Sequence, residues 1–582
     1  MNRVPSRVVR RSLPPYAGRP EAVMLTSRAR GAKVEPRALS RAFGVLCGIA
    51  VVIAIAYVVP SLHALRPWVR GGTYVPFWNI VGRELMGQGN ELEAEAARVA
   101  KLRRQTQPLR FAGLRRPIQA VASHTQRTLL RVEAANPVFP AYVPPAELET
   151  PEYGVEPADA LDYYYRKLTL ADLGTPGAIA RAGHWGDSVL GVDGITSAIR
   201  RRLQARFGDA GHGFHLMDRY NPSYQQQGVE FEPGGGWERC LIVQQCQRQD
   251  NRYGYGGLIV FSHGGAASVW RTPKEGFGQT VSAFELWFAH REGGGELELT
   301  IDGERTERVS TRGPHLADGW YRVDLSPGPH SFRVRAQGPG MVRAYGVVLE
   351  NDGPGVVWDG MALIGGSTRG LRTQDAEHIA SQIRRRDLDL LVFLFGGNDM
   401  ERNWVDLKQS MQPYYDEFSD VLQRFRAGKP ELPCLILSVT DHGERTEGDD
   451  IVSRPFAKEL AAAQREVARQ NGCGFFDTYE AMGGEGSVAR WFRASPRLIS
   501  PDLGHPTGAG HEVIGGLVAN AIFHGYESFR RRMQGQPFPE LSSERKAAPR
   551  AAPAPVYSAP QDAGGADQRD AGDGAAANAP DG

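Results

Sequence analysis

Hydrophobic and polar positions along this chain fall into two patterns that alternate in blocks. Residues 158–223 and 353–531 alternate short apolar runs with stretches in which apolar residues recur at helical spacing. The runs 388–395 and 434–439 are typical of buried parallel strands, whereas 195–207 and 455–470 predict helices, the second ended by Asn471-Gly472. These two blocks therefore predict an α/β fold with an open parallel sheet.

Residues 224–352 follow a different pattern, in which apolar and polar residues alternate with period two. The segments 284–288, 296–301 and 330–335 show it clearly, and Gly- and Pro-rich turns separate them. This is typical of an antiparallel β-sandwich. Because the block lies between the two α/β blocks, we expect the sandwich to be inserted into the α/β domain.

Five aromatic residues of the expected sandwich have two interpretations. They could stack on sugar rings, but alternating aromatics in a sandwich more often fill its core, and we favour the core for Trp270, Trp287, Phe288, Trp320 and Tyr321.

The N-terminal region predicts a membrane anchor. Residues 1–41 hold ten Lys/Arg and two Glu, and an apolar run over 42–62 follows without a charged residue. Its length is close to the roughly 20 apolar residues that cross a bilayer, which disfavours the alternative of a buried core helix. The positive-inside rule then leaves 1–41 as a cytoplasmic tail and places everything after the anchor outside the cytoplasm. Membrane insertion is enough to explain the basic tail, so no nucleic-acid partner is predicted.

Two further regions have the composition of connecting or unstructured chain. Residues 63–157 combine a charge-mixed helical stretch with a Pro-rich end, and we expect a stalk or linker. Residues 532–582 are rich in Ala, Pro and Gly and hold few large apolar residues, so we expect a disordered tail.

The positions of the cysteines say less about the fold than the apolar patterns do. Cys240 and Cys246 could form a small disulfide if the region lies outside the cytoplasm, whereas Cys434 and Cys473 sit beside apolar strands and are expected as core thiols. No Cys/His cluster has zinc spacing, so no metal is predicted.

Three short motifs carry the chemistry. Gly186-Asp187-Ser188 lies between an apolar stretch and a predicted helix, so Ser188 would sit on a strand-to-helix turn at the carboxyl end of the sheet. Asn398, in a Gly-Gly-Asn-Asp loop, follows the strand 388–395, where its side-chain amide could donate to an oxyanion.

The third motif pairs an acid with a base on one loop. Asp502 stands three residues before His505, so its carboxylate could bind one imidazole nitrogen while the other faces the serine. Each motif also has a plain structural interpretation: a helix N-cap for Ser188, a turn residue for Asn398, and an ordinary surface loop for Asp502 and His505. We expect structural or solvent-facing positions, not catalytic ones, for five other histidines: His184, His212, His215, His442 and His511.

The order of these motifs resembles that of the SGNH (GDSL-type) hydrolases. The resemblance implies Ser188 as nucleophile, His505 as base and Asp502 as its orienting acid, with no metal or cofactor. It also implies an oxyanion hole formed by the Ser188 amide, Asn398 and a glycine of Gly365-Gly366, for which we favour Gly365 because residues 357–365 resemble the family's strand-and-glycine block. The implied fold is a flavodoxin-like, three-layer parallel sheet.

The division of the motifs by a β-sandwich gives a narrower resemblance, to peptidoglycan O-acetylesterases with an inserted carbohydrate-binding-like module. It implies a serine esterase, anchored in the inner membrane and facing the periplasm, that removes O-acetyl groups from an acetylated polysaccharide, with peptidoglycan the favoured substrate. Two alternatives stay open: an O-acetyltransferase on the same scaffold, and an inert glycan-binding envelope protein.

Overall fold

A computed structural model describes residues 97–98, 100–101, 137–144, 151–244, 246, 250–402 and 410–541, without the side chains of 401 and 402. The chain divides into two units, 1–87 and 88–582, and every described residue belongs to the second. The expected cytoplasmic tail (1–41) and membrane anchor (42–62) lie outside the described residues, as do most of the expected stalk and residues 542–582. Within the described part of the chain, no helix has the length and apolar character needed to cross a membrane.

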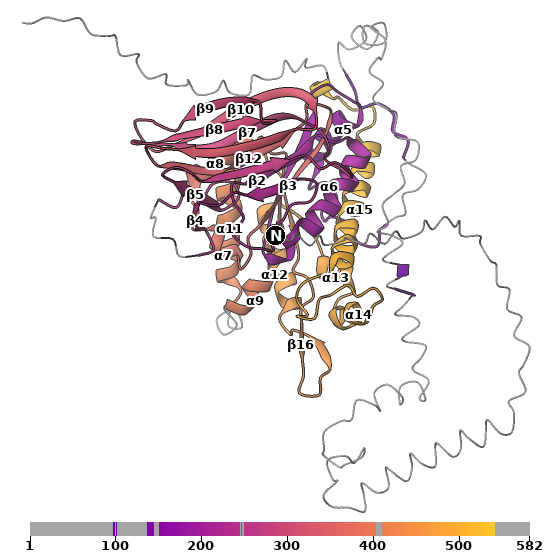
Figure 1. The fold of residues 1–582 in the computed structure, drawn as a ribbon. Helices are drawn as coiled ribbons and strands as arrows, with labels where there is room; N and C mark the ends of the chain where they lie inside the picture. Colours follow the sequence, from indigo (N-terminus) through magenta and orange to yellow (C-terminus); the bar gives the residue numbers. More distant parts are fainter. Residues whose placement is uncertain are drawn as a thin grey trace, which may run out of the picture. The chain divides into compact units, whose positions relative to one another are not determined.

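A five-stranded parallel sheet forms the centre of the α/β part (Figure 1). Its spatial order is β13 (Gly355–Ala362), β1 (Ile179–Gly186), β14 (Leu390–Leu394), β15 (Cys434–Leu437) and β18 (Gly474–Phe476). Numbered along the chain this is the order 2-1-3-4-5 of flavodoxin-like sheets, which place ligands at the carboxyl ends of strands 1 and 3. The expected parallel α/β sheet is confirmed, and its ligand-binding edge is where β1 and β14 end.

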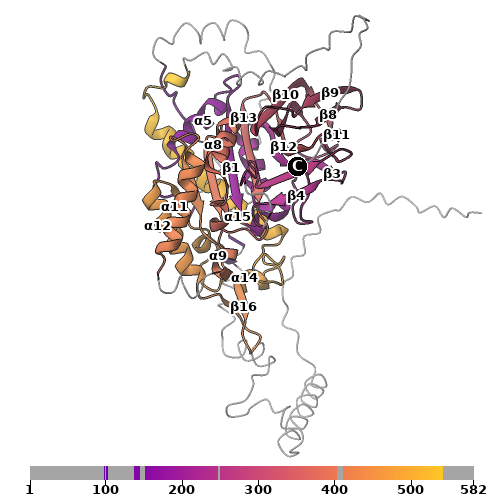
Figure 2. The same ribbon diagram turned by 90° about the vertical axis from the view of Figure 1, so that its left-hand side faces the viewer.

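Helices cover both faces of this sheet (Figure 2). On one face lie α5 (Asp162–Asp172), α6 (Gly194–Phe207) and α15 (Gly508–Met533), and on the other α8 (Ala376–Arg386), α11 (Gln412–Arg426) and α12 (Ala457–Asn471). As predicted, α12 ends at Gly472, which adopts the left-handed conformation with φ +63°. The shorter elements near the carboxyl edge are η2 (Ser188–Asp193), α7 (Thr368–Leu371), α9 (Gly397–Arg402), β16 (Gly443–Arg445), β17 (Ile451–Ser453), α13 (Thr478–Met482) and α14 (Ser487–Arg493).

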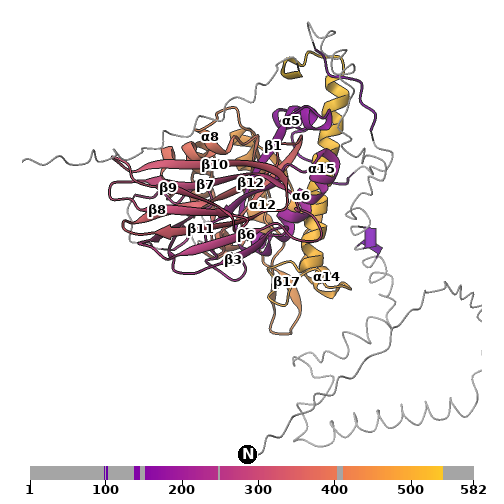
Figure 3. The same ribbon diagram turned by 45° about the horizontal axis from the view of Figure 1, so that its top comes forward.

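Two antiparallel sheets form the β-sandwich (Figure 3). One has the order β10 (Ala317–Gly328), β7 (Val281–His290), β12 (Val342–Glu350), β5 (Leu258–Ser262) and β4 (Glu238–Leu241), and the other β3 (Glu230–Pro233), β6 (Ala267–Arg271), β11 (Ser331–Gln337), β8 (Glu296–Ile301) and β9 (Arg305–Ser310). Strand β2 (Gly211–Leu216), in the segment assigned above to the hydrolase domain, pairs antiparallel with β12. The sandwich sheet therefore begins before residue 224.

The sandwich and the parallel sheet share a buried, charged contact. Arg386 of α8 donates to Glu350 of β12 at 2.5 Å and to Asp359 of β13 at 2.7 Å, and Arg181 of β1 also donates to Glu350. All four side chains are at most 8% exposed. Removing one partner would leave an uncompensated buried charge, so this network fixes the two parts against each other.

The interior of the sandwich holds the aromatics that were expected there. Trp270, Trp287 and Phe288 are buried, and Trp320 and Tyr321 are partly buried and pack against the core. The three buried rings, Trp270, Trp287 and Phe288, are therefore not exposed for stacking on sugar rings.

Parts of the expected stalk and tail pack on the α/β domain. Phe139 is buried and stacks on Phe538 with a centroid distance of 3.9 Å, and Val138 pairs with Pro537. Helix α15 continues past residue 531 to Met533, and the 3-10 turn η3 spans Pro539–Leu541. The first part of the expected disordered tail is therefore ordered, because a few aromatic residues in otherwise polar sequence find partners on the domain.

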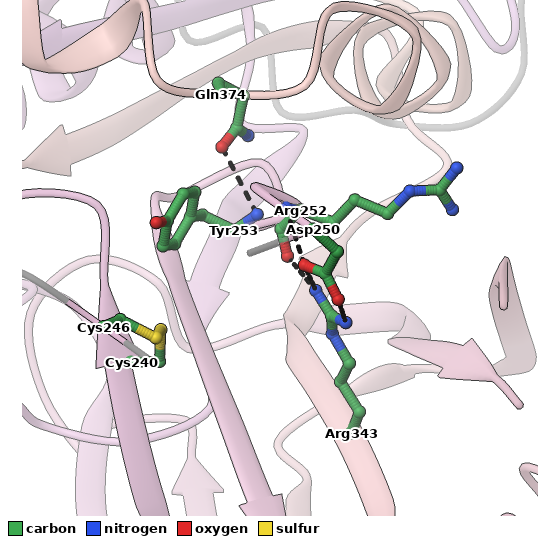
Figure 4. The surroundings of a disulfide bond; sticks show 7 residues. All are labelled: Cys240, Cys246, Asp250, Arg252, Tyr253, Arg343 and Gln374. Carbon is green, nitrogen blue, oxygen red and sulfur yellow. Dashed lines mark hydrogen bonds and ion pairs between the residues drawn. A yellow bond between two sulfur atoms is a disulfide. The ribbon is translucent and has the colours of Figure 1, made fainter. Parts of the chain in front are cut away.

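Both cysteine pairs form disulfides. Cys240 is bonded to Cys246, in agreement with the suggestion from sequence (Figure 4). Cys434 and Cys473 are also bonded, so the expectation of core thiols was wrong. The neighbouring strands β15 and β18 bring their Cα atoms to 4.7 Å, within the range for a disulfide, and this adjacency is not visible in a linear sequence.

Candidate active site

A hydrogen-bonded chain of three side chains lies at the carboxyl edge of the parallel sheet. Ser188 begins η2, directly after the end of β1, and its Oγ lies 2.7 Å from Nε2 of His505. The other imidazole nitrogen, Nδ1, lies 2.9 Å from Oδ2 of Asp502. This is the order of contacts by which a carboxylate orients an imidazole that takes a proton from a serine. The structure thus brings together residues that are 317 positions apart in the sequence.

The loop that carries the acid and the base is held in a specific shape. Oδ1 of Asp502 accepts hydrogen bonds from the amides of Gly504 and His505, both at 3.0 Å. Between Asp502 and Gly504, Leu503 adopts φ +60°, an unusual conformation for a non-glycine residue, while its side chain is buried and its carbonyl accepts from the Gly443 amide at 2.8 Å. Partial burial opposes ionisation of Asp502, but the hydrogen bonds from His505 and Gly504 outweigh it and lower the pKa of Asp502.

Asp187 fixes the turn that presents the serine. Its buried carboxylate accepts the amide of Val189 at 2.9 Å, as the N-cap of η2, and the amides of Gly396 and Gly397 at 3.2 Å each. Burial raises the pKa of Asp187 despite these donors. The residue joins the loop after β1 to the loop after β14 and so sets the distance between Ser188 and the Asn398 loop.

Three groups near the Ser188 hydroxyl are candidate donors to an oxyanion: the amides of Ser188 and Gly365 and the side-chain amide of Asn398. Asn398 donates one N–H to the carbonyl of Gly366 at 2.8 Å, which orients its amide and leaves the second N–H for a ligand. Gly365 is exposed with φ +81°, and within the described residues neither its amide nor that of Ser188 donates a hydrogen bond. The Gly366 amide, in contrast, donates to Leu363 at 2.7 Å. The geometry therefore favours Gly365 over Gly366.

A second buried acid holds the two oxyanion loops together. Asp399 accepts the amide and the hydroxyl of Thr368, the hydroxyl at 2.8 Å. Burial raises the pKa of Asp399 to about 7, with a smaller contribution from the charge of Asp187. The start of α9, which carries Asn398, is thus bonded to the start of α7, which follows Gly365 and Gly366.

The other histidines occupy structural positions. His184, His212, His215 and His511 are buried, and burial lowers the pKa of His511 to about 4. His442 is only partly buried, and its Nδ1–H donates to the carbonyl of Thr440 at 2.8 Å. It lies between the Asn398 loop and the His505 loop, because a methyl group added at Gly397 or Gly504 would meet its ring. Its place at the site had no signal in the sequence.

Sequence reasoning also gave no role to the two buried acids of the motifs. Asp187 lies in the motif that contains Ser188, and Asp399 directly follows Asn398 in the second motif. Their places in these motifs are the sequence signal that could have identified both acids as part of the site. No group of His, Cys, Asp and Glu within the described ranges could hold a metal ion.

Comparisons with known proteins agree with this geometry. The model of the GDSL-like lipase/acylhydrolase family matches residues 331–513, which include Gly365, Asn398, Asp502 and His505. No curated protein sequence matches the chain. A solved structure described as a peptidoglycan O-acetylesterase in action is similar, with 20% identity and a TM-score of 0.53, over 64% of this chain and 97% of that one.

Two further structures are similar at lower TM-scores. The Bacillus subtilis protein YXIM has 14% identity and a TM-score of 0.24, over 52% of this chain and 91% of its own. Axe2, an acetylxylan esterase from Geobacillus stearothermophilus, has 19% identity and a TM-score of 0.21, over 30% of this chain and 73% of its own.

The matched segment begins within β11, so the family model covers the second part of the α/β domain and omits the first, which carries Ser188. The insertion of the sandwich explains this omission, and the contact between Ser188 and His505 restores the missing part of the site. Residues 331–513 therefore match the GDSL-like lipase/acylhydrolase (SGNH) family, and this match together with the Ser188–His505–Asp502 contacts supports an ester hydrolase.

Proposed function

We propose that the chain is a membrane-anchored, extracytoplasmic esterase that removes O-acetyl groups from a cell-envelope polysaccharide, with peptidoglycan as the substrate. The observation that carries the proposal is the contact series Ser188–His505–Asp502 beside three amide donors. The likeness to a peptidoglycan O-acetylesterase along 97% of that chain supports the choice of polysaccharide.

The proposed reaction uses two acyl transfers. Ser188 Oγ attacks the carbonyl carbon of the acetyl ester while His505 Nε2 takes its proton, and the oxyanion is stabilised by the amides of Ser188 and Gly365 and by Asn398. Collapse expels the sugar oxygen, which receives the proton from His505, and leaves an acetyl-serine. Water, deprotonated by His505, then attacks this ester, and Ser188 leaves with the proton as acetate is released.

Solvent access favours water as the second acceptor. The side chains of His505 and Asp502 are 47% and 54% exposed, so water reaches the base directly. An acyltransferase must protect its acyl-enzyme from water, and this open site gives the expected hydrolysis the advantage over transfer to a second sugar.

Two disulfides support a location outside the cytoplasm. Bonds between Cys240 and Cys246 and between Cys434 and Cys473 persist in oxidising compartments and are rare in the cytosol. Together with the basic tail and the apolar run 42–62, they support a periplasmic site held at the inner membrane by a single span.

The test is release of acetate by the full chain from O-acetylated peptidoglycan and from acetylated xylan, with and without an unacetylated sugar acceptor. We expect acceptor-independent release from peptidoglycan that Ser188→Ala abolishes. Turnover only with the acceptor would instead establish a transferase. Inactivity on both polymers would refute the proposed esterase.

A further inference from the structure

An irregular segment between β2 and β3 contacts η2, the turn that begins at Ser188. Residues 220–227, called here the strap, connect β2 to β3 and belong to the crossover into the sandwich. The carbonyl of Ser223 accepts the amide of Val192 at 2.7 Å, and the amide of Gln227 donates to the carboxylate of Asp193 at 2.8 Å. The strap therefore binds the end of η2, the turn that begins at Ser188.

The bonded part of η2 has a conformation that needs such support. Val192 and Asp193 adopt φ +55° and +52°, in the left-handed region. A β-branched residue is a clear outlier there and persists only when the surrounding structure imposes it. The hydrogen bond from Val192 to Ser223 is one such constraint.

The first residue of the strap contacts the glycine loop on the other side of the site. The hydroxyl of Tyr220 donates to the carbonyl of Ala362 at 2.6 Å and accepts the amide of Ile364 at 3.0 Å. Burial raises the pKa of Tyr220 to about 12, so the hydroxyl keeps its proton at neutral pH. A single phenol thus bonds the two ends of a three-residue segment that leads directly into Gly365.

Within the described residues the Gly365 amide itself donates no hydrogen bond, and the turn that contains it is closed by the Gly366 amide, which donates to Leu363 at 2.7 Å. Gly365 is exposed, adopts φ +81°, and a methyl group built on its Cα would have no neighbour within 4 Å. The orientation of the Gly365 amide therefore follows from this turn and from the path of residues 362–364 that leads into it. On the other side of that path, the Leu363 amide donates to Gly186 at 2.8 Å, which sets the start of the loop but not the direction of the Ile364–Gly365 peptide.

We propose that Tyr220 is a positioning residue of the oxyanion hole: its hydroxyl orients the Gly365 amide toward the oxyanion, so that the crossover into the sandwich takes part in catalysis. The inference rests on the proposed function for its kinetic readout. We expect Tyr220 to affect the stability of the transition state more than substrate binding. The Gly365 amide forms a stronger hydrogen bond to the negatively charged oxyanion than to the carbonyl oxygen of the bound ester.

The experiment compares Tyr220→Phe with Tyr224→Phe in the full chain. Tyr224 lies in the same strap, its ring is 5.6 Å from that of Tyr220, and its hydroxyl accepts from Leu216 of β2 instead of the glycine loop. Both variants lose one buried hydroxyl, so the comparison removes effects of burial and of general stability.

We expect Tyr220→Phe to lower kcat by roughly 10- to 100-fold, less than the 10²–10³ for deleting an oxyanion donor, with KM within about twofold. Affinity for a boronic acid that forms a tetrahedral adduct with Ser188 should fall by the same factor as kcat. Amide hydrogen exchange at Ile364 should accelerate, because its acceptor is gone. Tyr224→Phe should leave all three quantities close to wild type.

Two results would overturn the inference: a kcat of Tyr220→Phe within twofold of that of Tyr224→Phe, or equal exchange at Ile364 in both variants. If the wild-type chain hydrolyses no ester, the proposed function fails. Hydrogen exchange at Ile364 then decides by itself whether Tyr220 orders the glycine loop.

Discussion

The exposure of the acid in the candidate triad leads to a quantitative prediction for Asp502→Asn. Asparagine can keep the two hydrogen bonds from the amides of Gly504 and His505 through its carbonyl oxygen. Its NH₂ group would then face Nδ1 of His505, where the native carboxylate accepts at 2.9 Å. The substitution therefore preserves the loop, removes the charge and favours the wrong imidazole tautomer.

The size of the expected loss in kcat/KM depends on how strongly solvent screens the attraction between Asp502 and protonated His505. Attraction between unit charges at 4 Å is about 1 kcal/mol in water and about 4 kcal/mol at the permittivity typical of a protein surface. Since Asp502 is 54% exposed and His505 47%, we expect an intermediate loss of transition-state stabilisation. About 2 to 4 kcal/mol corresponds to a roughly 30- to 1,000-fold lower kcat/KM, below the roughly 10⁴-fold loss known for a buried triad aspartate.

The assay is hydrolysis of p-nitrophenyl acetate between pH 6 and 9, with Asp449→Asn as the matched control. Asp449 is 78% exposed and forms an ion pair with Arg445 on the hairpin β16–β17, so its loss changes the net charge equally. We expect the control to retain wild-type kcat/KM. A loss of less than fivefold in Asp502→Asn, or an equal loss in the control, would refute the orienting role of Asp502.

Three further predictions concern neighbouring features. Asn398→Ala should lower kcat by about 10²- to 10³-fold with little change in KM, which steady-state kinetics would measure; an unchanged kcat would exclude Asn398 as a donor. Replacing Cys434 and Cys473 by serine should lower the free energy of unfolding in urea by about 4 kcal/mol, given the 39-residue separation, and an unchanged unfolding midpoint would contradict this. The raised pKa of Asp399, about 7 against 3.8, means that the folded state keeps a proton that the unfolded chain loses between about pH 4 and 7. Stability should therefore fall as pH rises through this window, by at most about 4 kcal/mol, and Asp399→Asn should flatten the dependence of the unfolding free energy on pH; parallel curves for variant and wild type would refute it.

The sequence was informative where local pattern determines structure. The apolar runs that became β14 and β15, the helix α12 and the alternation in β8 and β11 each bury a face whose spacing is visible in the chain. The serine, asparagine, aspartate and histidine of the candidate site each lie in a short motif at the end of such an element.

The remaining features depend on contacts between distant segments. The disulfide of Cys434 requires the neighbouring strand β18, and the ordering of Phe538 requires Phe139, about 400 residues earlier in the chain. Strand β2 follows α6 in sequence but joins the sandwich, since its partner β12 returns only after the whole insertion. Tyr220 lies in an irregular segment without periodicity, so only the structure reveals its bonds to the glycine loop.

We propose above that Ser188 carries the acetyl group from the polysaccharide to water. The most direct measurement is rapid acid quenching of the full chain during turnover of O-acetylated peptidoglycan, followed by mass analysis of its peptides. We expect a transient acetyl group on Ser188 that is absent in Ser188→Ala and that accumulates when deacylation is slowed. Release of acetate by the Ser188→Ala variant, or transient acetylation of a different residue, would contradict this role of Ser188.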